Sequence, residues 1–397
     1  MPEQTAGPNP NDSFAEAFGE PVTSVLDVQT WHEGADLATL YDALRQAVAA
    51  SVEQERRVRA PIRQLLFSRI GNSTDRFAPP CAGVYQLTAE DVQETHRCLL
   101  FNGATECCDG TVAAHDSLLL SVVQIGIALV AYQGSQGTWV QRLYRRDLHT
   151  HHPDPVAEAM ELLERRAQRP TDDSDEPRDE LSSLVRRTLM EYAERALLVD
   201  RSQAPWRMGH GNPVPSNMLL LTGGGARELL NAGLDVLRRL IQQHRRFVYV
   251  ASSPADRLLL TIGDALHPLE FAIVETLSAQ FAKLRLIESR RAGEERKDVV
   301  QFMEEIGPEV VTGVYRAAPQ APARVFYAHR DHAYEAAAIA IADSVLQPYR
   351  GFPMLIDLAD TLCGNTFDAA SFAGSLQNAY AAAGEPYRYL GERETRA

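Results

Sequence analysis

The stretch ECCDGTVAAHDSLLLSVVQIGIALVAYQG, residues 106–134, places an acid and a glycine ahead of a long apolar run. Asp109-Gly110-Thr111 has two interpretations: a hairpin turn that happens to carry an acid, or a metal-binding carboxylate at the end of a buried strand. The apolar run over 118–132 contains Gln124 and Gly126 and is shorter than the roughly 18 residues of a membrane span. We therefore expect buried strands on both sides of Asp109.

Composition favours a globular protein with a substantial core. The chain has 397 residues, of which 45% are hydrophobic and 23% charged. Its formal net charge of −14 argues against unaided DNA binding over a broad face, but not against a nuclease whose acids hold cations. The five cysteines lack CxxC spacing, so we expect neither a zinc site nor disulfides. No signal peptide or membrane span is evident, so we expect a cytoplasmic protein.

Three regions are predicted along the chain. Residues 1–30 are rich in Pro, Asn, Gly and acids, and we expect a disordered tail. Residues 31–75 form a predicted helical arm, with Asp36 as N-cap and Pro61 as an end or kink. Its apolar residues recur at helical spacing: Leu37, Leu40, Tyr41, Leu44, Val48 and Val52. The arm is either a helix packed on the main domain or an oligomerisation element.

The main domain is predicted over residues 76–397. Strands come first, and strands then alternate with helices, a pattern that indicates an α/β fold with a mixed sheet flanked by helices. NMLLLTGGGARELL, residues 217–230, is interpreted as a strand, a Gly-rich turn and a helix. An acidic spacer over 170–180 precedes a long amphipathic helix over 180–199.

Carboxylates follow several of these elements. Asp109 is predicted to end one strand, and Asp357 and Asp360 follow the chain reversal GFP, residues 351–353. The long helix adds Glu180, Glu191 and Glu194. Carboxylates that meet at one edge of a sheet suit hard divalent cations, and a pair of such ions can promote phosphodiester hydrolysis.

Three blocks of the sequence resemble the NurA nucleases. CCDGTVAAHDSLLLSVVQIGIALV (residues 107–130) is similar to the family's strand–DGS–strand block, with Thr111 in place of Ser. Residues 217–259 resemble the second such block, and residues 349–396 resemble the C-terminal block with its G-[YF]-P turn and acidic Ala-Asp. The likeness runs in order from about residue 80 to the C-terminus, and each motif alone is weak.

The resemblance implies an RNase H-like fold, homodimerisation and DNA cleavage that depends on Mn²⁺ or Mg²⁺. It also implies a HerA-like hexameric ATPase as partner in DNA end processing. Asp109 matches the first metal-binding aspartate, and Asp360 falls where the family places an acid or histidine near the active site. Glu191 fits the metal-binding glutamate better than Glu180 does, with an ambiguity of at least one helical turn.

One position departs from the family. Thr222 stands where the second block has a metal-binding aspartate, and a neutral hydroxyl is a poor ligand for Mg²⁺ or Mn²⁺. Three hypotheses stay open. The chain is a metal-dependent DNA nuclease, an inactive adaptor of the same fold that docks on a HerA-like ATPase in repair or phage defence, or an unrelated α/β protein.

Overall fold

The chain divides into two compact units, Met1–Ala60 and Pro61–Ala397. The computed structural model describes residues 10–31, 37–71, 76–117, 120–134, 136–145, 154, 156–157, 159–160, 163–164, 183–221, 226–252, 256–282 and 297–389. None of the helices within these ranges combines the length and the apolar character needed to cross a membrane.

The first unit is helical. It contains α1 (Pro10–Phe18), α2 (Val22–Leu26), the 3-10 helix η1 (Val28–Thr30) and most of α3 (Leu37–Ile62). Phe14 and Phe18 lie one turn apart on α1 with ring centroids 4.6 Å apart, a spacing that supports a short helix. Residues 1–9 of the tail predicted over residues 1–30 lie outside the described residues. The predicted N-cap Asp36 lies outside the described residues.

Helix α3 confirms the helical period of residues 37–52. It continues past Pro61 into a π-helical turn, η3 (Arg63–Phe67), and then α4 (Ser68–Ile70). Pro61 therefore does not end the helix, and the backbone hydrogen-bond pattern changes just after it instead. Arg63, in the second unit, reaches Glu270 at 2.6 Å and ties η3 to the sheet.

The second unit is built on a nine-stranded mixed sheet in the order β1-β7-β8-β9-β6-β5-β2-β3-β4. The strands are β1 (Gly83–Gln86), β2 (Thr105–Asp116), β3 (Ser121–Val130), β4 (Gly137–Arg145), β5 (Trp206–His210), β6 (Phe247–Ala251), β7 (Glu270–Thr276), β8 (Val310–Arg316) and β9 (Arg324–His329). The pairs β2–β5 and β5–β6 are parallel, and the other pairs within the described strands are antiparallel.

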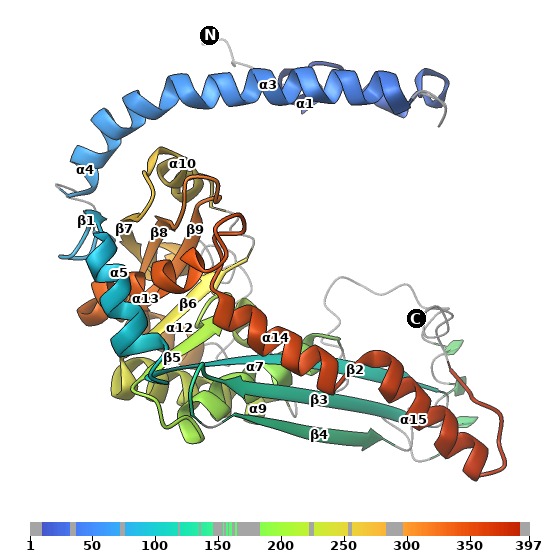
Figure 1. The fold of residues 1–397 in the computed structure, drawn as a ribbon. Helices are drawn as coiled ribbons and strands as arrows, with labels where there is room; N and C mark the ends of the chain where they lie inside the picture. The colour runs from blue at the N-terminus through green and yellow to red at the C-terminus, as the bar shows by residue number, and fades with distance from the viewer. Residues whose placement is uncertain are drawn as a thin grey trace, which may run out of the picture. The chain divides into compact units, whose positions relative to one another are not determined.

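Helices cover both faces of the sheet, as Figure 1 shows. One layer holds α5 (Ala89–Thr95) with η4 (His96–Leu100), α13 (Ala333–Val345) and α14 (Met354–Thr366). The other holds α7 (Ser183–Asp200), α9 (Ala226–Arg238) with η5 (Arg239–His244), and α12 (Lys297–Ile306). Adjacent Cys107 and Cys108 belong to the two opposite cores, because successive side chains of a strand point to opposite faces of the sheet. The predicted α/β mixed sheet flanked by helices is confirmed.

Remaining elements complete the second unit: α8 (Ser216–Leu219), α10 (Arg257–Ala265), η7 (Gly307–Glu309), η8 (Arg330–His332) and α15 (Ala369–Ala382). Helix α8 corrects one prediction, because residues 217–219 were expected to form a strand. The four-residue apolar run after Pro215 is short enough for either structure, and sequence periodicity cannot separate the two. The strand next to β2 is β5, which lies earlier in the chain.

Candidate metal-dependent nuclease site

The site lies at the fork where the two parallel strands β2 and β5 separate. Strands β2 and β5 pair from Thr105↔Trp206 to Cys108↔Gly209, and β5 then ends at His210. Gly211, at φ 81°, adopts a backbone conformation that favours glycine and turns the chain away. Strand β2 continues to Asp116 because β3 still pairs with it. Asp109 thus lies in the middle of a strand, and the prediction that it ends one is wrong.

Gly110 lets a helix approach this fork closely. A side chain at Gly110 would meet Glu194 Oε1 at 2.8 Å and Met190 Cγ at 2.9 Å, both on α7. Only glycine therefore leaves room for the Glu194 carboxylate against the strand. This explains the DG pair of the sequence physically: Asp109 lines a cavity with residues of α14, and Gly110 leaves room for Glu194 on the face of β2 that packs against α7.

Glu194 is held by the neighbouring Arg195. The Arg195 guanidinium contacts Glu194 Oε2 at 3.0 Å and donates to the carbonyl oxygens of Glu191, Asn212 and Pro213 at 2.7–2.9 Å. Arg195 is only 2% exposed and also packs over the Tyr249 ring. Arg195 therefore fixes α7 to the loop after β5 and so holds the position of the helix relative to the fork.

Burial and nearby negative charge destabilise the charged forms of both acids. Burial raises the pKa of Asp109 to about 7, and the charge of Asp360 adds to this rise against the backbone hydrogen bond from Gly110. Burial raises the pKa of Glu194 to about 8 against the attraction of Arg195, and the charges of Asp109 and Glu191 add to the rise. Such shifts mark a place where positive charge from outside the chain would be favourable.

Helix α14 brings two further acids to the fork. Its first turn is anchored by the buried Asp343, which accepts hydrogen bonds from Leu355 N at 2.8 Å and Tyr132 Oη at 2.5 Å. Asp357 is engaged by Gln347 and Arg350 at 2.6 and 2.5 Å, whereas Asp360 is exposed. These side chains line a cavity of about 300 Å³ formed by Asp109, His210, Ser252, Arg324, Arg350, Phe352, Ile356, Asp357 and Asp360.

His210 is a site residue that the sequence prediction missed. It ends β5 beside Asp109, and burial lowers its pKa against the opposing effect of Asp360 and Asp357. The neutral imidazole can therefore offer a nitrogen ligand or accept a proton near neutral pH. The available signal was the sequence MGHGNP, residues 208–213, in which a polar residue follows a short apolar strand and precedes a Gly-Asn-Pro turn.

The predicted residues have different positions in the structure. Asp109 and Asp360 share the cavity, as expected. Glu191 lies one turn before Glu194, accepts from Asn217 Nδ2 at 2.9 Å, and has a buried Oε2 without a hydrogen-bond partner among the described residues. Glu194, rather than Glu191, is the glutamate beside Gly110. Glu180 and Thr222 lie outside the described residues.

The donor types fit a hard divalent cation, although the ligand set is incomplete. Asp109, Glu194 and Asp360 offer carboxylate oxygens, which Mg²⁺ and Mn²⁺ prefer, and His210 offers a nitrogen. The raised pKa values of Asp109 and Glu194 also fit a cation that would relieve their mutual repulsion. However, no three His, Cys, Asp or Glu side chains in the described part of the chain already stand in a metal-holding arrangement.

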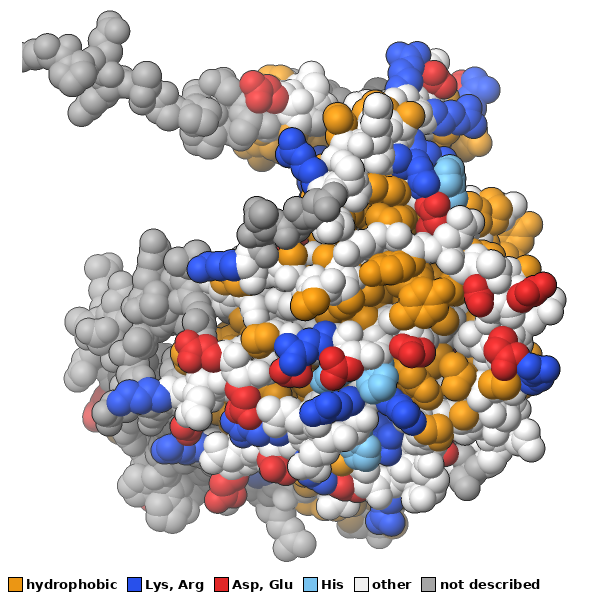
Figure 2. Space-filling view, turned by 90° about the vertical axis from the view of Figure 1, so that its left-hand side faces the viewer, with side chains coloured by type: hydrophobic (Ala, Val, Ile, Leu, Met, Phe, Trp, Pro, Cys, Tyr) orange, Lys and Arg blue, Asp and Glu red, His pale blue; other side chains and the backbone are white. Residues whose placement is uncertain are grey.

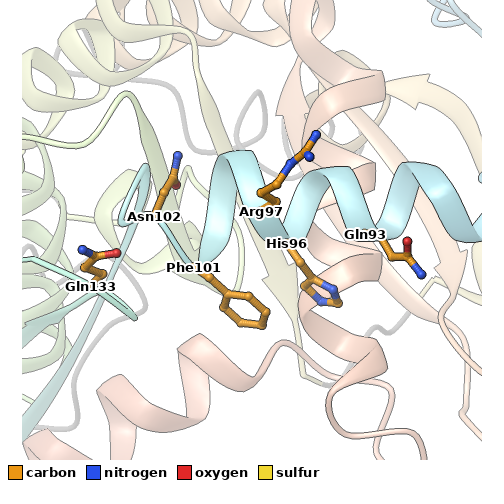
Figure 3. A pocket seen from close by; sticks show the side chains of 6 residues that line it. All are labelled: Gln93, His96, Arg97, Phe101, Asn102 and Gln133. Carbon is orange, nitrogen blue, oxygen red and sulfur yellow. The ribbon is translucent and has the colours of Figure 1, made fainter.

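A larger surface hollow of about 470 Å³ lies elsewhere, at the end of η4. It is lined by Gln93, His96, Arg97, Phe101, Asn102 and Gln133, and Figure 3 shows the His96 and Phe101 rings on one side of the helix. These rings stack with centroids 4.9 Å apart. None of these lining residues is a carboxylate, so the hollow lacks the groups that metal-dependent hydrolysis needs.

Comparison with known proteins gives likeness in structure only. No family model matches the chain, and no curated protein matches its sequence. The chain is similar to the crystal structure of the NurA nuclease from Sulfolobus solfataricus, at 10% identity over 82% of this chain and 91% of that one, with a TM-score of 0.42.

Two further structures show the same kind of likeness. A crystal structure of NurA with manganese is 9% identical over 85% of this chain and 98% of that one, with a TM-score of 0.41. Endonuclease V from Ciona intestinalis, in complex with inosine-containing DNA, is 13% identical over 66% and 84%, with a TM-score of 0.27. At such scores the likeness carries no argument about activity, which has to come from the residues of the site.

Proposed function

We propose that the chain is a metal-dependent DNA nuclease of NurA type, with Asp109 and Glu194 as the main ligands of the cation. The observation that carries the proposal is the pair of buried carboxylates at the β2–β5 fork, whose pKa values are both raised. A buried acid without a matching cation destabilises a fold, and such strain is typical of functional sites.

Each residue of the site has a proposed role. Asp109 and Glu194 bind Mn²⁺ or Mg²⁺, and Asp360 contributes a further carboxylate from the exposed side of the cavity. Glu191, the glutamate predicted from sequence, adds negative charge next to Glu194. When bound, the cation supplies an activated water molecule and stabilises the leaving oxygen of the phosphodiester. His210, as a neutral imidazole, can accept the proton of that water.

Cleavage of linear DNA tests the proposal. Purified protein is incubated with end-labelled DNA and Mn²⁺ or Mg²⁺, beside Asp109→Ala and a control, Asp235→Asn, whose carboxylate is 68% exposed on α9. We expect cleavage by the wild type and the control, and none by Asp109→Ala. Cleavage that survives in Asp109→Ala would rule out this site.

A second function has its own support. His210 lines the cavity as an imidazole whose pKa is lowered by burial, and a neutral imidazole adds no negative charge for a cation. The chain would then be an adaptor that does not cut DNA and docks on a HerA-like hexameric ATPase. This partner and a homodimeric state are proposed from the sequence resemblance for both functions.

Sedimentation with a HerA-like ATPase separates the two functions when it is combined with the cleavage assay. Complex formation with cleavage supports the nuclease, and complex formation without cleavage in any metal supports the adaptor. A chain that stays unbound to the ATPase would remove the partner from both proposals.

A further inference from the structure

The acidic cavity at the fork also contains a guanidinium group with no counter-ion. Arg324 begins β9 and lines the same cavity as Asp109 and Asp360. Within the described residues, no carboxylate lies within ion-pair distance of Arg324. Arg350, the other arginine of the cavity, contacts Asp357 at 2.5 Å and so has its charge balanced.

The contacts of Arg324 leave most of its donors free. Nη1 donates to the Ser252 carbonyl at 2.9 Å and Nη2 to the Arg350 carbonyl at 2.7 Å, and the guanidinium lies over the Phe352 ring at 5.4 Å. Nε is buried and has no hydrogen-bond partner in the described structure. A guanidinium has five N–H donors, so these contacts fix its plane and leave donors for a ligand.

The chemistry of a cavity lined by acids and one unbalanced guanidinium points to a phosphate ligand. Carboxylates alone repel DNA, and the chain as a whole carries a net charge of −14. On the face in Figure 2, Lys and Arg side chains are interspersed with Asp and Glu, with no broad basic patch. Contact with a phosphodiester therefore depends on local hydrogen-bond donors, and arginine binds phosphate oxygens through the N–H groups of its planar guanidinium.

We propose that Arg324 binds a backbone phosphate of DNA lying in the cavity, opposite the acids Asp109 and Asp360. This inference rests on the proposed function, since it takes DNA as the ligand. Ser252 and Arg350 position the guanidinium through their carbonyl oxygens, and Phe352 supports its face. Arg324 is thus a substrate-binding residue that lines the same cavity as Asp109 and Asp360.

The test measures binding separately from cleavage. A fluorescent single-stranded oligodeoxynucleotide is titrated with wild type, Arg324→Gln, Arg324→Lys and the surface control Arg238→Gln, in Ca²⁺ instead of Mn²⁺ and over a range of salt. We expect Arg324→Gln to weaken binding about 10-fold and to reduce the slope of log K against log salt by about 1. Arg324→Lys should keep that slope, and Arg238→Gln should behave as wild type.

Three results would overturn the inference. The first is an unchanged affinity and salt slope in Arg324→Gln. The second is loss of binding in both variants together with a lowered unfolding temperature, because Arg324 would then only hold Ser252 and Arg350. The third is Arg324-dependent binding of inorganic phosphate without binding of DNA. Failure of the nuclease proposal looks different: DNA binding that depends on Arg324, without cleavage in Mn²⁺.

Discussion

Asp109 and Glu270 are equally buried acids of one sheet, each 6% exposed, and their pKa values shift in opposite directions. Glu270, at the start of β7, receives Arg63 through both carboxylate oxygens at 2.6 and 3.0 Å. Burial alone would raise its pKa, but these bonds and the one from His267 N lower it. Asp109 receives only the hydrogen bond from Gly110 N among the described contacts, and its pKa rises to about 7.

The contrast separates a structural acid from a functional one. Glu270 finds its positive partner within the chain, so its burial holds η3 on the sheet. Asp109 shares the fork with Glu194, and the guanidinium that lowers its pKa, that of Arg195, is already engaged by Glu194 and three carbonyl groups. Burial therefore predicts nothing about function until the partners of the buried group are known.

Removal of the Asp109 charge is expected to have the largest effect. Asp109→Asn keeps the shape of the side chain and removes the anionic ligand, so we expect DNA cleavage to fall about 1000-fold or more. Folding should not suffer, because the substitution also removes an unfavourable buried charge. Rates come from end-labelled DNA, with thermal unfolding as the check on folding. A variant that cuts DNA normally would place Asp109 with Glu270 among the structural acids.

Removal of the positive partner of Glu270 tests the other half of the comparison. Arg63→Met leaves the Glu270 carboxylate buried without its partner, and we expect the free energy of unfolding to fall by about 3 kcal/mol. Urea unfolding measures this change, with Arg388→Met as the control, because Arg388 forms an exposed pair with Glu385. Cleavage per folded molecule should stay at the wild-type rate. Equal stability of Arg63→Met and wild type would mean that the Arg63–Glu270 pair holds nothing in place.

Much of this site could be predicted from sequence, and the failures have physical causes. Asp109 and Asp360 were recognised because a DG pair and a GFP turn are local patterns. The sequence cannot separate Glu191 from Glu194 because both lie on one charged helix, and only the structure shows that Glu194 is the one beside Gly110. His210 was missed because β5 has five residues and too little pattern for detection.

The sheet was predictable to a similar degree. The ten-residue strand β3 is buried throughout, and its apolar run indicated this directly. The segment over 217–219 is predicted as a strand and forms α8, whereas the strand β5 is not predicted. Which strands become neighbours depends on long-range pairing, which a local pattern does not contain.

Mn²⁺ should stabilise the protein through Asp109 at the fork, independently of the Arg63–Glu270 pair. A ligand that binds only the folded chain adds about 2.7 kcal/mol at a concentration 100 times its Kd. We expect Mn²⁺ to raise the unfolding temperature of wild type and of Arg63→Met by similar amounts, and to have no effect on Asp109→Asn. Differential scanning fluorimetry in Mn²⁺ and in EDTA measures this. An equal rise in all three proteins would show that the cation binds away from the fork.

The smallest expected effect is a change in how stability depends on pH in the absence of metal. Asp109 and Glu194 have folded pKa values of about 7 and about 8, above their ordinary values of 3.8 and 4.5. Between these limits the folded chain binds more protons than the unfolded chain, so stability should fall as the pH rises from about 5 to about 8. Glu270 has a lowered pKa, so its contribution is present above its ordinary value of 4.5 and is lost as the pH falls below it.

The two regions therefore contribute opposite slopes in separate pH windows. Asp109→Asn and Glu194→Gln should each flatten the fall between about pH 5 and 8, and Arg63→Met should flatten only the loss below about pH 5. Urea unfolding in EDTA at a series of pH values measures both. Parallel curves for wild type and Asp109→Asn above pH 5 would mean that the fork acids are not held protonated by burial. The cation would then have no repulsion to relieve, and the strongest reason to place it at the fork would be gone.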